Sequence, residues 1–155
     1  GLYHRFRNRR SLTVIMFHRV IDPADPRWAS CDPDYTLDAA LFERWNRALK
    51  TGEPAQVLAN YAPDSVLLPT LSKLPRLTPE AKVDYFEHFL HDRPSGKIDS
   101  RSIQLGCNMA VDIGLYTFTF AKTGAVAHAR FTYTYVWDGQ QWLISSHHSS
   151  LLPDK

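Results

Sequence analysis

Aromatic and small polar residues alternate along the stretch Arg130-Phe131-Thr132-Tyr133-Thr134-Tyr135. Because neighbouring side chains of a β-strand point to opposite faces of the sheet, this stretch predicts a strand with one aromatic face and one small, polar face. Apolar residues on both sides extend the predicted strand to residues 125–137. The dipeptide Asp138-Gly139 that follows is typical of a tight hairpin, and it predicts a turn into a further strand over residues 141–148.

Two more strands are predicted before this hairpin, over residues 98–105 and 110–120. The tripeptide Lys122-Thr123-Gly124 separates the second of them from strand 125–137 and has the composition of a turn. Strands that follow one another through short turns usually pair with their neighbours in the chain. This part of the sequence therefore predicts a four-stranded antiparallel meander.

The region before these strands is predicted to be mainly helical. Apolar residues recur at helical spacing over residues 37–49, with Thr36 as a candidate N-cap. A second, short helix begins at Pro54 and a third at Thr78, and a short strand over residues 65–69 lies between them. Helices followed by an antiparallel meander predict an α+β fold, in which the helices cover one face of a curved sheet.

Length and composition place the chain among single-domain globular proteins. It has 155 residues, of which 44% are hydrophobic and 22% are charged, and this mixture argues against disorder. No apolar run approaches the roughly 20 residues that span a bilayer. The run over residues 12–17 is shorter than a signal-peptide core of about 7–15 residues. We therefore expect a soluble protein and no membrane partner, while the compartment stays open.

The net charge of +2 is unevenly distributed. Residues 1–10 hold four arginines and no acidic residue, which leaves 14 basic against 16 acidic residues in the rest of the chain. A basic tail on a mildly acidic domain lacks the supporting basic face of a nucleic-acid-binding protein, so no nucleic acid is expected as a partner. The two cysteines, Cys31 and Cys107, either form one disulfide bond or are two small buried residues.

Short motifs along residues 41–153 carry a family resemblance. They are Leu41-Phe42-Glu43-Arg44-Trp45-Asn46, Thr51-Gly52-Glu53-Pro54, Asn60-Tyr61-Ala62-Pro63-Asp64-Ser65-Val66-Leu67-Leu68-Pro69-Thr70, Asp84-Tyr85-Phe86, Gly96-Lys97-Ile98-Asp99, Gly114-Leu115-Tyr116-Thr117-Phe118-Thr119-Phe120, Trp142-Leu143-Ile144 and His147-His148-Ser149-Ser150. With these motifs the chain resembles the SnoaL-like branch of the nuclear transport factor 2-like superfamily. Within that branch it is most similar to bacterial relatives of the association domain of calcium/calmodulin-dependent protein kinase II.

This resemblance implies a cone, in which a strongly bent antiparallel sheet wraps around a long N-terminal helix. It also implies assembly into a homodimer or a larger oligomer. The aromatic strand faces exceed what one layer of helices covers, so we expect a homodimer through the sheet that buries over about 1,000 Å² in total. Residues 36–155 form the predicted cone domain, and residues 1–35 form a predicted N-terminal arm or fusion remnant.

Residues 11–43 resemble the opening of a polysaccharide deacetylase domain. Such enzymes hold their metal with an Asp-Asp pair and a His-x-x-x-His pair, and this sequence contains neither. We therefore expect no deacetylase chemistry. The sequence also lacks a glycine-rich phosphate loop, a serine nucleophile elbow and a His-Glu-x-x-His motif, so no cofactor and no metal are expected.

The adjacent histidines His147 and His148 are the most conspicuous polar pair. Neighbouring strand residues point to opposite faces, so at most one of them reaches the interior of the cone, and the two cannot chelate one metal. Strict alternation places His148 on one face with Trp142 and Ile144, and His147 on the other face. We therefore select His148 as the candidate pocket histidine, beside the default interpretation as a structural or interface residue.

Asp112 and Arg130 are the other candidates in the meander. Asp112 lies in an apolar strand, either as a tuned general base or, as we favour, as an exposed residue near the strand end. Arg130 could hold a carboxylate ligand or pair with Asp112 across the strands. We expect Tyr61, Tyr116, Arg130 and His148 to bind a small anionic or aromatic ligand.

Two function classes follow from the resemblance. The first is a non-catalytic domain that forms oligomers and binds a small ligand. The alternative is a cofactor-independent SnoaL-like isomerase or hydrolase with an acid/base residue in the cone cavity, for which Asp112 and His148 are the catalytic candidates. The superfamily fold alone does not separate these classes, because the same fold supports both.

Overall fold

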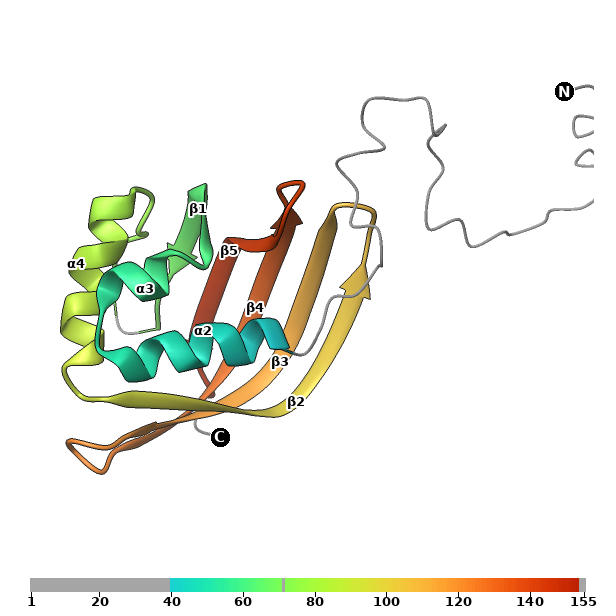
Figure 1. The fold of residues 1–155 in the computed structure, drawn as a ribbon. Helices are drawn as coiled ribbons and strands as arrows, with labels where there is room; N and C mark the ends of the chain where they lie inside the picture. The colour runs from blue at the N-terminus through green and yellow to red at the C-terminus, as the bar shows by residue number, and fades with distance from the viewer. Residues whose placement is uncertain (1–39, 71, 154–155) are drawn as a thin grey trace, which may run out of the picture.

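The computed structural model of the protein describes residues 40–70 and 72–153 (Figure 1). The predicted arm over residues 1–35, the cysteine Cys31 and most of the deacetylase-like segment lie outside the described residues. Within the described ranges, no helix is both long and apolar enough to cross a membrane.

Helices α2 (Ala40–Thr51) and α4 (Pro79–Leu90) confirm the two long helices predicted from apolar periodicity. The short helix α3 (Pro54–Leu58) begins at the predicted proline. Thr78 caps α4, because its hydroxyl oxygen accepts a hydrogen bond from the backbone N–H of Ala81 at 3.2 Å. Helix α2 crosses one face of the sheet, and α3 and α4 lie together at one end (Figure 1).

The sheet has five strands in the order β1-β5-β4-β3-β2. Strands β2 to β5 form the predicted antiparallel meander, whereas β1 pairs with β5 in parallel. Together with the helices they form an α+β fold around a curved, unclosed sheet (Figure 1). The bounds are β1 (Tyr61–Leu68), β2 (Pro94–Leu105), β3 (Met109–Phe120), β4 (Val126–Trp137) and β5 (Trp142–Leu151).

Two strands begin earlier than the sequence predicts. Strand β1 begins at Tyr61, and its turn-like residues lie in an irregular stretch where the register with β5 shifts between Tyr61 and Val66. Strand β2 begins at Pro94, and proline is a residue that the first position of a strand tolerates. Its backbone is then fixed to α2 by Asn46, which donates to the Gly96 carbonyl at 2.7 Å and accepts from the Gly96 N–H at 2.8 Å.

The bend of the sheet depends on a glycine in β3. The register between β2 and β3 shifts between Ile98 and Ser100, which pair with Tyr116 and Leu115, and Gly114 pairs with the next residue, Arg101. A Cβ atom on Gly114 would collide with the Ser100 carbonyl oxygen and with the backbone of Arg101. Only glycine therefore permits this close approach of the two strands, which is where the meander curves.

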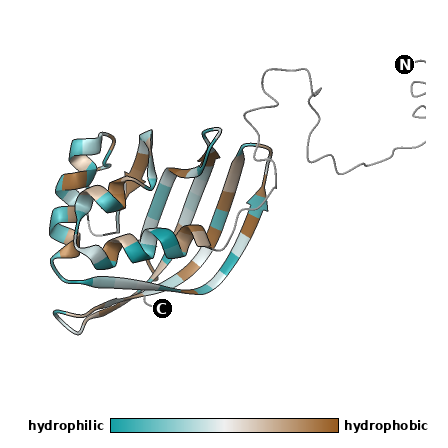
Figure 2. Cartoon of the chain, in the orientation of Figure 1, coloured by the Kyte–Doolittle hydropathy of each residue, from teal (hydrophilic) through white to brown (hydrophobic). Residues whose placement is uncertain are grey.

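The aromatic face predicted from the alternation in β4 is the core face. Phe131, Tyr133 and Tyr135 are buried, while the threonines between them are half-buried on the outer side. Figure 2 shows bands of hydrophobic and hydrophilic residues along the strands of the sheet. Trp45 of α2 packs edge-on against Tyr133, with ring centroids 5.8 Å apart, so helix and sheet share one aromatic core.

Candidate functional site

An apolar cavity lies between α4, the end of β1 and the inner face of β3, β4 and β5. Its volume, measured as the space open to the centre of a water molecule, is about 50 Å³. One water needs about 10–15 Å³ by that measure, so several waters or one small organic molecule fit. The cavity is lined by Trp45, Leu67, Pro69, Thr70, Tyr85, Phe86, Phe89, Tyr116, Phe118, Phe120, Ala127, Ala129, His147, Ser149 and Leu151.

A β-bulge in β5 determines which side chains of that strand reach the cavity. Thr134 of β4 pairs with Ser146, but the next residue, Tyr135, pairs with Ile144. Ser145 is therefore an extra residue on β5, and its hydroxyl donates to the Thr134 carbonyl at 3.1 Å. An extra residue changes the phase of inward and outward side chains beyond it.

The phase change places His147 on the inner face and His148 on the outer face. Ile144 and His147 are both buried, whereas His148 is exposed. The prediction that His148 shares the inner face with Ile144 is wrong, because strict alternation takes no account of a bulge between them. The small polar pair Ser145-Ser146 is compatible with a bulge, but it is equally compatible with a regular strand.

A hydrogen-bonded chain fixes the protonation of His147. The indole Nε1–H of Trp45 donates to the Tyr61 hydroxyl oxygen at 3.1 Å, and that oxygen lies 2.9 Å from His147 Nδ1. The Tyr61 hydroxyl has no other partner among the described residues, so its proton is used only if it is donated to Nδ1. The imidazole is therefore neutral and carries its proton on Nε2, which is buried and has no partner among the described residues.

Burial supports the same protonation states. It lowers the pKa of His147 to about 3, with a further lowering from the adjacent His148. Burial also raises the pKa of Tyr61 well above its ordinary value, so its hydroxyl keeps its proton at neutral pH. An unpaired buried N–H costs about 1–3 kcal/mol, and His147, which carries this group, is one of the residues that line the cavity.

Three hydroxyl groups form a second polar point on the cavity wall. Tyr116 donates to the Ser149 hydroxyl oxygen at 2.5 Å, and Ser149 is hydrogen-bonded to the hydroxyl of Thr70. Burial raises the pKa of Tyr116, so this cluster is uncharged at neutral pH. Among the described residues, no aspartate, glutamate, lysine or arginine lines the cavity.

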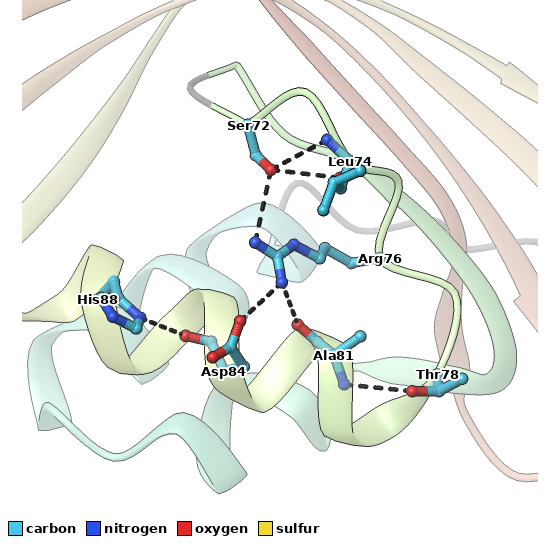
Figure 3. Close-up of polar contacts among 7 residues, drawn as sticks. All are labelled: Ser72, Leu74, Arg76, Thr78, Ala81, Asp84 and His88. Atoms are coloured by element: carbon cyan, nitrogen blue, oxygen red, sulfur yellow. Dashed lines mark hydrogen bonds and ion pairs between the residues drawn. The ribbon is translucent and has the colours of Figure 1, made fainter.

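The loop that carries Thr70 is attached to α4 by Arg76 (Figure 3). Arg76 donates to the Asp84 carboxylate at 2.7 Å and to the Ser72 hydroxyl oxygen at 3.5 Å. Its guanidinium carbon also lies 5.8 Å from the ring centroid of Tyr85, which lines the cavity. These contacts join Ser72 and Arg76 to α4 beside Tyr85, which lines the cavity.

Asp112 lies on the inner face and is fully buried, so the preferred prediction of an exposed carboxylate is wrong. Its partner is Arg101 of β2, which donates from both Nε and Nη2 to the two carboxylate oxygens. This hydrogen-bonded ion pair raises the pKa of Arg101. Arg130 does not pair with Asp112, because its side chain lies on the opposite face of the sheet.

The structure separates the predicted site residues into two groups. Tyr116 lines the cavity, and Tyr61 is hydrogen-bonded to His147, which also lines it. Arg130 and His148 instead line a shallow depression on the outer face. His147, Ser149 and Thr70 are cavity residues that the sequence does not predict, since their placement depends on the bulge and on a loop.

Comparisons with known proteins agree with this architecture. A family model of the calcium/calmodulin dependent protein kinase II association domain matches residues 38–153. A Xanthomonas campestris protein provisionally described as such a domain is 46% identical; the match covers 76% of this chain and 86% of that chain, with a TM-score of 0.73. No curated protein matches the sequence.

More distant structures show the fold alone. A Thiobacillus denitrificans protein, provisionally described as the same association domain, is 16% identical over 79% of this chain and 100% of that chain, with a TM-score of 0.61. A Streptomyces avermitilis protein, provisionally described as a dehydratase of the nuclear transport factor 2-like family, is 8% identical over 74% and 92%, with a TM-score of 0.66. The fold is therefore nuclear transport factor 2-like, as the resemblance implied.

Proposed function

The chain belongs to the calcium/calmodulin dependent protein kinase II association domain family, and from that premise we propose that it is a non-catalytic domain that self-associates and binds a small ligand in its cavity. The self-association is supported chiefly by the outer face of the sheet. The ligand binding is supported by the cavity and by the unpaired Nε2 of His147.

The outer face of β3 carries apolar side chains at alternate positions. Ile113 is 42% exposed, Leu115 is 36% exposed and Met109 is 50% exposed. Leu105 on the neighbouring strand β2 is also exposed. Grouped exposed apolar side chains are typical of an interaction surface, and the family membership favours a second copy of this chain as the partner.

Polar side chains accompany these apolar ones. Arg130 and His148 line a depression on the outer face together with Ile113 and Leu115. Protein interfaces commonly combine an apolar centre with a polar rim, and arginine is enriched in them. We therefore assign Arg130 and His148 to the self-association surface instead of the ligand cavity.

Sedimentation velocity of the full chain at micromolar concentration tests this assignment. The wild type should sediment as a dimer or a larger oligomer, because a specific interface of over about 1,000 Å² is stable in that range. Leu115→Glu should shift the distribution toward monomer. Leu74→Glu is the matched control, because Leu74 is 65% exposed but lies in the loop before α4. A monomeric wild type, or an oligomer unaffected by Leu115→Glu, would contradict the proposal.

The catalytic alternative has weaker support from the geometry. Its two candidates lie on opposite faces of the sheet, and Asp112 is paired with Arg101. The cavity histidine, His147, has its pKa lowered to about 3, far from the neutral range in which a general base works best. A cofactor-independent isomerase or hydrolase would have to use these groups in another arrangement.

A further inference from the structure

We propose that the cavity selects an uncharged small molecule with a hydrogen-bond acceptor, such as an amide or ketone carbonyl, and that the Nε2–H of His147 is the donor that binds it. The inference rests on the proposed ligand-binding function and adds the chemical class of the ligand. His147 is thereby the specificity-determining residue of the cavity.

The first support is the unpaired donor itself. The chain from Trp45 through Tyr61 to His147 leaves Nε2 protonated, buried and without a partner among the described residues. Buried N–H groups in folded proteins are nearly always hydrogen-bonded. Because His147 lines the cavity, an acceptor on a molecule in that cavity is the partner that this geometry calls for.

The hydroxyl cluster supplies a second donor. Tyr116, Ser149 and Thr70 have three hydroxyl protons, and the two hydrogen bonds that join them use two. One proton therefore remains for another acceptor. Tyr116 donates to Ser149, so the remaining donor is Ser149 or Thr70, and both of these residues line the cavity.

The charge of the cavity excludes an anion as the preferred ligand. The residues that line it include no lysine or arginine, and both donors are uncharged. A carboxylate that leaves water for neutral donors alone loses more hydration than they replace. Arg130, predicted from the sequence to hold an anion, lies on the outer face. Burial also opposes protonation of His147, so the imidazole does not readily become a cation for an incoming anion.

Isobutyramide and isobutyrate form a matched pair of probes, because they have nearly the same shape and differ in charge. Ligand-observed NMR titration of the full chain at pH 7 measures both affinities. We expect isobutyramide to bind at least about tenfold more tightly, which corresponds to about 1.4 kcal/mol. His147→Phe should abolish this preference, because it removes the donor and keeps an aromatic ring. His147→Gln should retain it, because its side-chain amide keeps a donor near Nε2. His91→Phe, at the exposed C-cap of α4, is the matched control and should leave both affinities unchanged.

Equal or tighter binding of isobutyrate to the wild type overturns the inference, although the proposed ligand-binding function then stands. Absence of binding by isobutyramide overturns it as well. Retention of the amide preference in His147→Phe moves the specificity to another residue and overturns the assigned role of His147. The wild-type comparison needs no variant to fold, and self-association is measured separately by sedimentation.

Discussion

Loss of either partner of the buried ion pair between Arg101 and Asp112 should have unequal effects on stability. The Asp112 side chain is 0% exposed, whereas the Arg101 side chain is 21% exposed. Arg101→Met leaves a carboxylate buried without a counter-ion, and breaking a buried pair in this way costs about 3–5 kcal/mol. Asp112→Asn leaves a guanidinium that already reaches solvent and keeps a side-chain acceptor, so we expect a smaller loss of about 1–3 kcal/mol.

Urea-induced unfolding measures these differences, with the wild type, both single variants and a double variant compared at one protein concentration. The double variant Arg101→Met/Asp112→Asn combines the two substitutions and removes both charges. It should be more stable than Arg101→Met alone, because no ion remains buried and unpaired. Equal losses in the two single variants, or a double variant whose loss is the sum of the single ones, would refute this reasoning. The first outcome would mean that solvent reaches Asp112, and the second that the two side chains do not interact.

Three further predictions concern the helix–sheet contact, the bend and the buried histidine. Asn46→Leu should lower the free energy of unfolding by about 2–5 kcal/mol in urea titration, because it leaves the buried N–H and C=O of Gly96 unpaired. A loss under about 1 kcal/mol would contradict the role given to Asn46. Gly114→Ala should lower the melting temperature more than Gly96→Ala in calorimetry. A Cβ atom on Gly114 meets backbone at 2.0 Å, whereas one on Gly96 meets the ends of two phenylalanine rings at 3.0 Å. The reverse order would count against the close approach of β2 and β3. In the folded protein the pKa of His147 is about 3, below the unfolded value of about 6.5. The free energy of unfolding should therefore fall as the pH drops from 6.5 toward 3, by up to about 1.4 kcal/mol per pH unit. His147→Phe should lack this contribution, and an unchanged pH slope in the variant would show that His147 is not its source.

Local patterns were sufficient to predict most of the elements. The alternation over residues 130–135 correctly placed Phe131, Tyr133 and Tyr135 together on one face, which the structure shows to be buried, because side-chain direction in a regular strand depends only on position. Pro79 and the capping hydroxyl of Thr78 likewise located the start of α4. These signals are contained within a few neighbouring residues, so no knowledge of the partner strands was needed.

The candidate site was predicted less well, because it depends on pairing between distant segments. His147, and not His148, lies on the inner face because of a bulge that appears only when β5 is paired with β4. The burial of Asp112 follows from Arg101, which the β2–β3 register brings beside it. Neither register can be read from the residues around the histidines or the aspartate, so charge and alternation alone assigned both sites to the wrong face.

The parallel pairing of β1 with β5 has a consequence for the order of folding. Tyr61 pairs with Ile144, whereas the strands of the meander pair through short connections. Closing the long intervening segment has a higher entropic cost, so we expect the meander to form first and β1 to dock last. Strand β1 and the loop after it supply Leu67, Pro69 and Thr70 to the cavity wall. Strand β1 is also an edge strand, whereas β3 and β4 are paired on both sides, so hydrogen exchange at β1 should be faster than in β3 and β4. Local opening of β1 gives a small molecule a route into the cavity while the rest of the sheet stays folded.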